Sequence, residues 1–164
     1  MTSPRIGTET NLQVGGTYDL LLVKFLGTFP EGQITFGLHD TPMKVTGLQK
    51  VAQTFMKILL TTKGSDPFSP QRGTIFAEST IGANQIVNDP LYIQTITEAV
   101  MDAEEQTRSC LNAQNADLSS CLASVQILGL DKVDDSLTLF VALQTMNGTS
   151  ARIAVPFPEF GLDT

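Results

Sequence analysis

Apolar and polar positions alternate clearly in the last third of the chain. In residues 136–145 (SLTLFVALQT) every second position is apolar, which predicts a strand with one buried face. Residues 123–130 (ASVQILGL) and 149–156 (TSARIAVP) have strand-forming compositions on either side of it. The pair Asn147-Gly148 is a strong signal for a short hairpin turn. The pattern therefore predicts an antiparallel meander of three strands. Its middle strand would bury Leu137, Leu139, Val141 and Leu143.

A second strand-forming region lies near the amino terminus. Residues 18–26 (YDLLLVKFL) are rich in strand-compatible side chains, and residues 33–38 (QITFGL) alternate between polar and apolar. Pro30, Glu31 and Gly32 lie between these segments and supply turn chemistry. We therefore expect a β-hairpin here.

Helical periodicity begins after Thr46. Thr46 and Gln49 have the spacing of a capping box, in which each side chain would bond a backbone amide at the helix start. Gly64 is expected to close the helix as a left-handed cap. Six apolar residues fall on one helical face: Leu48, Val51, Ala52, Phe55, Ile58 and Leu59. Four polar residues are expected mostly outside: Gln49, Lys50, Gln53 and Lys57.

A longer helix is predicted from Asp89-Pro90 to about Asn115. Asp89 is suited to the N-cap, and Pro90 to the first helical position, where its missing N–H is not needed. The expected buried stripe is Ile93, Ile96, Val100, Ala103 and then Cys110 or Leu111. Residues 118–122 that follow are expected to form one helical turn at most.

Together these elements predict an α+β fold with two main helices on one side of an antiparallel sheet. A chain of 164 residues is suited to one domain. We expect that domain to span residues 17–156. Residues 1–16 are expected to form an extended arm, and residues 157–164 a carboxy-terminal tail.

Charge and apolar content exclude several classes of partner. The formal net charge is −7, and the ten Lys and Arg residues are scattered rather than clustered, so nucleic acid is not an expected partner. The strongest apolar run, residues 20–26, is short and contains Lys24, so no membrane-spanning helix is expected.

Cys110 and Cys121 are the only two cysteines, and the chain starts with a polar segment rather than with an apolar signal peptide. We expect small, buried, reduced thiols in a protein made in a cytoplasm.

Candidate catalytic chemistry is sparse. The single histidine, His39, follows a predicted strand and is expected to be an exposed turn residue. Glu104 and Glu105 are adjacent on a predicted helix and so point about 100° apart, which prevents them from forming a glycosidase pair by themselves. No zinc spacing or phosphate-binding glycine motif occurs in the sequence. We therefore expect no enzyme activity, no cofactor and no metal.

Three features are typical of protein binding instead, and the first is the amino-terminal arm, since a segment with no core of its own commonly orders only against a neighbour. The loop of residues 64–74 (GSDPFSPQRGT) carries Phe68, Arg72 and two prolines, and is either a contact surface or a rigid connection. The last predicted strand is expected to lie at a sheet edge, where the backbone around Arg152, Ile153 and Val155 would be available to another chain.

The chain resembles the lysozyme-like baseplate wedge proteins of contractile phage tails and related injection machines. Residues 45–74 (VTGLQKVAQTFMKILLTTKGSDPFSPQRGT) are similar to the family's first helix, its Leu-x-Thr-x-x-Gly segment and its proline-glycine loop. The later helix and strands match the family in order and length. The family's Glu-Pro-Arg motif lies near the end of its second helix. This chain has AEEQTRSCL there, with no proline and a longer spacing.

The resemblance implies a structural role despite the family name. Members bind a helical bundle of larger wedge subunits, lie near the tail tube and offer strands on which the tail sheath assembles. Several copies are implied in a sixfold assembly, within the tail baseplate of a virion made in a host cytoplasm. Glu104 or Glu105, with Arg108, would replace the Glu-Pro-Arg motif; an ordinary ion pair between Glu104 and Arg108 is the alternative. A peptidoglycan hydrolase and a tail completion or connector protein are the alternative functions.

Overall fold

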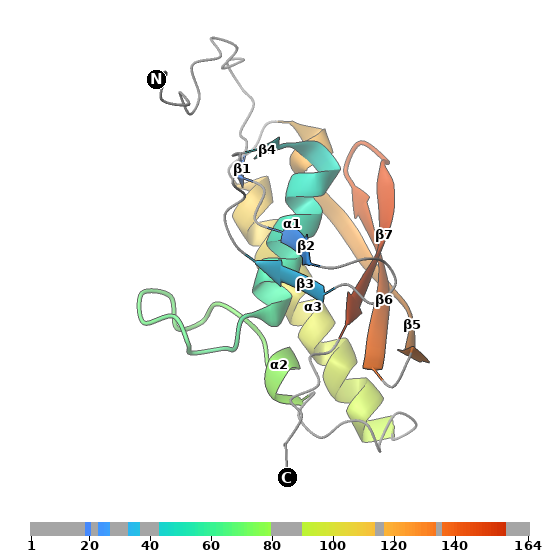
Figure 1. Cartoon of the computed structure of the whole chain (residues 1–164). Helices are drawn as coiled ribbons and strands as arrows, with labels where there is room; N and C mark the ends of the chain where they lie inside the picture. The colour runs from blue at the N-terminus through green and yellow to red at the C-terminus, as the bar shows by residue number, and fades with distance from the viewer. Residues whose placement is uncertain are drawn as a thin grey trace, which may run out of the picture.

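The computed structural model has an α+β fold in which two main helices cover one face of a three-stranded antiparallel sheet (Figure 1). This confirms the predicted fold class. The predicted arm, the tail, His39 and Asp89 lie outside the described residues. The structure describes residues 19–20, 23–26, 33–36, 43–79, 90–113, 117–133 and 136–156.

The sheet consists of β5 (Leu122–Val133), β6 (Ser136–Thr145) and β7 (Ser150–Pro156), in the order β5-β6-β7. All three predicted strands are confirmed, and β5 is longer than predicted at both ends. Leu139, Val141 and Leu143 of β6 are fully buried, as the alternation predicts. The side chain of Leu137 is outside the described part of the structure.

The turn between β6 and β7 confirms the hairpin signal. The amide of Gly148 donates to the Thr145 carbonyl (2.9 Å), and the amide of Thr145 donates to the Thr149 carbonyl (2.9 Å). Asn147 Oδ1 accepts hydrogen bonds from the Thr149 amide and the Thr145 hydroxyl. Gly148 has φ 88°, a backbone conformation that glycine adopts at little cost.

Helix α1 (Gly47–Leu60) has the predicted buried face but not the predicted caps. Thr46 is the N-cap residue, yet its side chain makes no capping hydrogen bond. Ser120 takes that role from a distant part of the chain, because its Oγ accepts from the Gly47 amide at 3.0 Å. The helix ends at Leu60, so the prediction that Gly64 caps it is wrong.

Two polar residues of α1 are buried although the periodicity places them mostly outside. Lys50 is 5% exposed and Gln53 is 2% exposed. Gln53 Nε2 donates to the backbone carbonyl of Leu20 at 2.8 Å. The buried position follows from this partner, which lies 33 residues away and is invisible to helical periodicity.

The amino-terminal hairpin is confirmed in part. β2 (Val23–Leu26) pairs antiparallel with β3 (Gln33–Phe36), as predicted. The earlier part of the predicted first strand is a separate strand, β1 (Asp19–Leu20), which pairs with β4 (Lys44–Val45). Residues 19–20 and 23–26 therefore belong to two small sheets rather than to one hairpin.

Helix α3 (Pro90–Asn112) begins at the predicted proline and ends three residues before the predicted end. Its buried stripe contains Ile96, Val100, Ala103 and Leu111, as expected. Ile93 is 45% exposed, so its predicted burial is wrong. Tyr92 is the buried residue at the start of the stripe instead, and it lies four residues before Ile96 on the same face.

The core lies between the helices and the sheet, so the opposite face of the sheet is left uncovered by α1 and α3 (Figure 1). Helix α1 contributes Val51, Phe55 and Leu59 to this core. Cys121 is buried as predicted, whereas Cys110 is only partly buried, and neither forms a disulfide. No helix in the described part of the chain is long and apolar enough to span a membrane.

Candidate functional site

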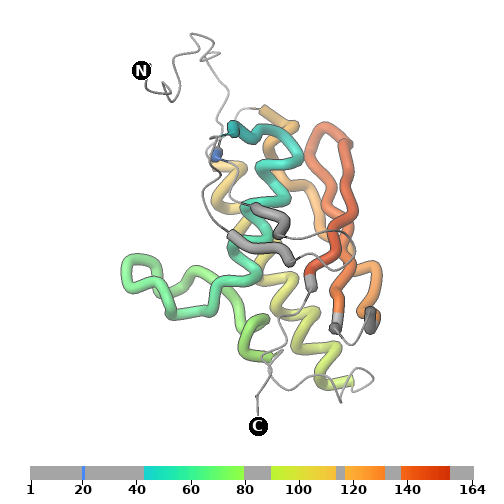
Figure 2. The backbone as a smooth tube through the Cα atoms, viewed as in Figure 1, coloured from blue at the N-terminus to red at the C-terminus, as the bar shows by residue number. Residues whose placement is uncertain are grey.

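Residues 64–74 form a loop whose two ends are held together at its base. The Lys63 amide donates to the Thr74 carbonyl (3.1 Å), and the Thr74 amide donates to the Thr61 carbonyl (2.8 Å). Thr62 and Thr74 form an isolated parallel bridge. The loop projects from the helical side of the molecule, away from the sheet (Figure 2).

Gly73 fixes the base of this loop against α3. Its amide donates to Gln106 Oε1 (3.0 Å), and its carbonyl accepts from Gln106 Nε2 (2.9 Å). Gly73 has φ 99°, and a Cβ atom there would lie 2.4 Å from the Thr61 carbonyl oxygen. The position therefore requires glycine for two independent reasons, backbone conformation and close approach.

The residue after Gly73 anchors the loop in the core. The Thr74 side chain is fully buried, and its hydroxyl donates to the Leu59 carbonyl at 2.8 Å. The same oxygen accepts from the Phe76 amide at 3.1 Å, at the start of α2 (Phe76–Ser79). The loop base is thus tied to α1, α2 and α3.

The tip of the loop presents a large apolar side chain. Two backbone turns shape it. The Asp66 carbonyl accepts a hydrogen bond from the Ser69 amide (3.2 Å), and the Ser69 carbonyl accepts one from the Arg72 amide (2.9 Å). Asp66 Oδ1 also accepts from the amide of Phe68 at 2.9 Å. The Phe68 side chain is 95% exposed, although burying a phenylalanine is worth about 1.5–3 kcal/mol. A preformed loop with an exposed aromatic tip is suited to binding, since little conformational entropy is lost when a partner covers it.

The edge strand β7 offers backbone groups in a definite register. Antiparallel pairs alternate between hydrogen-bonded and non-hydrogen-bonded, and the Thr145–Thr149 bond marks that pair as hydrogen-bonded. Counting along the register, Ile153 opposite Val141 is again hydrogen-bonded. Arg152 and Ala154 consequently direct their N–H and C=O groups away from β6. No strand among the described residues pairs with that side of β7.

The beginning of the other outer strand, β5, is already occupied by α3. Asn112 bonds Leu122 twice: Oδ1 accepts from the Leu122 amide (3.1 Å), and Nδ2 donates to the Leu122 carbonyl (3.2 Å). Arg108 donates to the carbonyl of Ala123 at 3.0 Å, next to a register shift in β5. The two sheet edges therefore differ, and β7 is the better candidate for pairing with another chain.

The structure brings together two of the three residues predicted to replace the Glu-Pro-Arg motif. Glu104 and Arg108 form an ion pair one helical turn apart, while Glu105 is exposed on a different part of the helix surface. Since Arg108 also bonds Ala123, the pair joins α3 to β5 within the chain. The Arg108 side chain is 44% exposed, and exposed ion pairs of this kind contribute only a few tenths of a kcal/mol.

The predicted edge residues differ in what they can offer a partner. Arg152 is exposed and Ile153 is partly buried against the core, whereas Val155 is 1% exposed. Val155 lies two residues after Ile153 and pairs with Leu139, so its backbone groups also point toward β6 and not toward a partner. On the loop, Arg72 is exposed together with Phe68.

Titratable groups with shifted pKa values have local structural causes. Side-chain and backbone hydrogen bonds from Ser119 lower the pKa of Asp117, which caps the short 3-10 helix η2 (Leu118–Ser120). Burial raises the pKa of Tyr92. Within the described residues, no group of three or more His, Cys, Asp or Glu side chains is arranged to hold a metal ion.

Sequence reasoning did not find the contacts that hold the base of the loop. Gly73 carries a weak signal, a glycine at the end of a proline-containing loop, but Gln106 carries none because its partner is 33 residues away. The open register of β7 follows only from the observed hydrogen bond at the turn. No protein-family model matches this chain, and no curated protein matches it significantly.

Proposed function

We propose that this chain is a non-enzymatic assembly subunit that binds other protein chains through the edge of β7 and the 64–74 loop. The observation that carries the proposal is the outward direction of the Arg152 and Ala154 backbone groups on an outer strand. A strand from another chain would extend the sheet there by ordinary antiparallel or parallel pairing. The exposed Phe68 ring provides a second contact on the helical side.

The more specific proposal is a wedge subunit of a contractile-tail baseplate. It is supported by the resemblance of residues 45–74 and by the shared order of elements. In this role the partners are other wedge subunits with a helical bundle, the tail tube and the sheath protein, which would supply the added strand. Several copies would surround a sixfold tail.

The energies indicate that the two contacts must act together. Arg152 and Ala154 each offer one donor and one acceptor, and a net hydrogen bond contributes about 0.5–1.5 kcal/mol, so the edge provides about 2–6 kcal/mol. Burial of Phe68 adds about 1.5–3 kcal/mol. Association alone costs about 4 kcal/mol or more, which exceeds the loop contact and leaves at most about 2 kcal/mol from the edge, so neither contact alone gives a stable complex. A subunit held at both sites matches this requirement.

The decisive experiment compares Ala154→Pro with Ala154→Ser in co-purification from assembled contractile-tail particles. Proline removes the outward N–H and is tolerated on a sheet edge, whereas serine keeps the N–H at a similar size. Loss of one hydrogen bond of about 1 kcal/mol should reduce the proline variant's incorporation at least about fivefold. The serine variant should incorporate like the wild type.

Thermal unfolding of both purified variants provides the control for folding. Equal incorporation of the two variants would remove the β7 edge from the interface. If the chain is missing from purified particles altogether, as measured by mass spectrometry, the baseplate assignment is wrong.

A further inference from the structure

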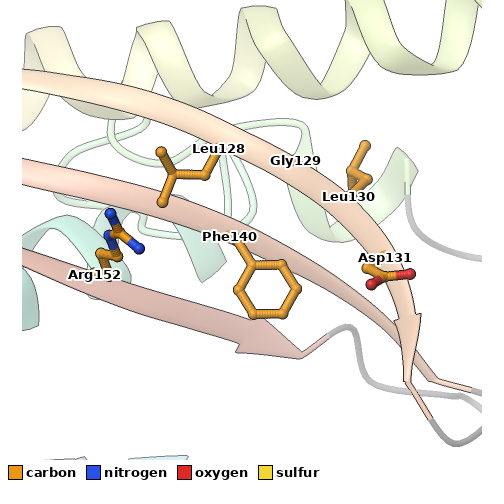
Figure 3. Close-up of a pocket in the computed structure, with 6 residues that line it drawn as sticks. All are labelled: Leu128, Gly129, Leu130, Asp131, Phe140 and Arg152. Atoms are coloured by element: carbon orange, nitrogen blue, oxygen red, sulfur yellow. The ribbon is translucent and has the colours of Figure 1, made fainter.

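The outer face of the sheet carries a recess of about 340 Å³ (Figure 3). It lies on the side away from the helices, where Phe140 of β6 and Arg152 of β7 meet the end of β5. The recess is lined by Leu128, Gly129, Leu130, Asp131, Phe140 and Arg152.

The strand register explains why the surface is hollow here. Phe140 pairs with Gly129 on one side and Ala154 on the other, so neither neighbour fills the space beside the aromatic ring. A register shift between Ile127 and Gly129 adds Leu128 to this edge of the recess, where it is 45% exposed. The result is an apolar floor bordered by one cationic and one anionic side chain, Arg152 and Asp131.

The 64–74 loop has the complementary arrangement. Its exposed Phe68 ring is flanked in sequence by Asp66 and Arg72, an anion and a cation. A phenylalanine side chain is small enough to enter a recess of this volume. Asp66 of the loop is opposite in charge to Arg152 at the recess, so that Asp66 of one copy can face Arg152 of another.

We propose that the loop of one copy inserts Phe68 into the sheet recess of a second copy. The loop of a chain cannot reach the recess of the same chain, because the loop projects on the helical side and the recess opens on the opposite side of the sheet (Figures 1 and 3). The contact is therefore head-to-tail, and it leaves one free loop and one free recess on every dimer. Contacts of this type repeat, closing into a ring when the rotation between copies permits.

This proposal rests on the 64–74 loop as a binding site, as in the proposed function, and names another copy as the chain that covers Phe68; it does not depend on the β7 edge or on the baseplate assignment. It would, however, join neighbouring copies in an assembly that holds several of them. The contact covers less surface than a standard protein interface, so the association is expected to be weak and concentration-dependent in solution.

Two variants test the contact from its two sides. Phe68→Ala removes the inserted side chain and leaves the recess intact, whereas Leu128→Glu blocks the recess and leaves the loop intact. In sedimentation velocity, each variant alone should associate at least about tenfold more weakly than the wild type. An equimolar mixture of the two should recover a one-to-one dimer, because one intact loop then meets one intact recess. Met101→Ala removes an apolar side chain that is 63% exposed elsewhere on α3 and should associate like the wild type.

Circular dichroism and thermal unfolding confirm that each variant is folded before the comparison. Arg152→Glu is a second recess variant, expected to weaken association by charge repulsion with Asp66. The proposal is overturned if the wild type remains monomeric up to about 1 mM, if Phe68→Ala associates like the wild type, or if the mixture forms no dimer. These outcomes bear only on the contact between copies, because binding at the β7 edge is tested separately with the Ala154 variants.

Discussion

Replacing Gly73 with alanine should test directly whether the 64–74 loop is held rigidly at its base. An added Cβ would lie 2.4 Å from the Thr61 carbonyl oxygen and would also occupy a backbone with φ 99°. The left-handed backbone costs about 1–2 kcal/mol for a residue with a side chain. Relieving the overlap requires Thr61 to move, which weakens its 2.8 Å hydrogen bond from Thr74 at a cost of about 1 kcal/mol. With the two hydrogen bonds to Gln106 also disturbed, we expect a total loss of about 3–4 kcal/mol.

Gly64→Ala provides the matched control in the same loop. Gly64 has φ 84°, but nothing lies within 4 Å of the position that its Cβ would take. This variant should lose only the conformational term, about 1–2 kcal/mol. The difference between the variants thus isolates the packing of Gly73 against Thr61 and its hydrogen bonds to Gln106.

The assay is equilibrium unfolding in denaturant followed by far-ultraviolet circular dichroism, because the chain has no tryptophan. For a chain of this size each kcal/mol lowers the melting temperature by about 2–4 °C. Amide exchange at Thr74 reports the same loss locally if the loop base opens before the rest of the molecule. Equal unfolding midpoints and equal exchange for the two variants would refute the close-packed loop base.

Three further predictions concern contacts that hold the fold. Ser120→Ala should cost about 1 kcal/mol by removing the cap of α1, whereas Thr46→Ala should cost clearly less because its side chain makes no capping bond; chemical denaturation compares them. Asn112→Ala should cost about 2 kcal/mol, since it leaves both backbone groups at the start of β5 without their partner, and a melting shift below about 2 °C would contradict this. Burial raises the pKa of Tyr92 in the folded state. The neutral phenol therefore contributes its full stability below the pKa of the unfolded chain, and this stability is lost as the pH rises through the pKa of the folded chain. Tyr92→Phe should therefore lose less stability than the wild type in melts taken from about pH 9 to 11.

Patterns of short range predicted most of the fold. Alternation in β6 and the Asn147-Gly148 turn sufficed for the meander, because strand period and turn chemistry are both local properties. The buried face of α1 followed from its spacing in the same way. Errors occurred where a distant partner decided the outcome. Gln53 is buried because it bonds Leu20, and Ser120 caps α1 in place of Thr46.

The candidate site shows the same division. The loop that carries Phe68 was predictable as a shaped segment, because prolines and glycines exclude regular helix there. The attachment of its base to Gln106 was not predictable, since nothing in the sequence relates these two segments. The recess beside Phe140 depends on a register shift at Leu128, which arises only when β5 pairs with β6.

Amide hydrogen exchange at single-residue resolution tests the central claim most directly, with the free chain compared to the chain in the proposed assembly. Ile153 pairs inward with Val141, so its amide should exchange slowly in both states. The amides of Arg152 and Ala154 should exchange quickly in the free chain and slowly after assembly, since another chain would then accept their hydrogen bonds. If both of them exchange equally fast before and after assembly, the edge of β7 binds no partner and the account is wrong.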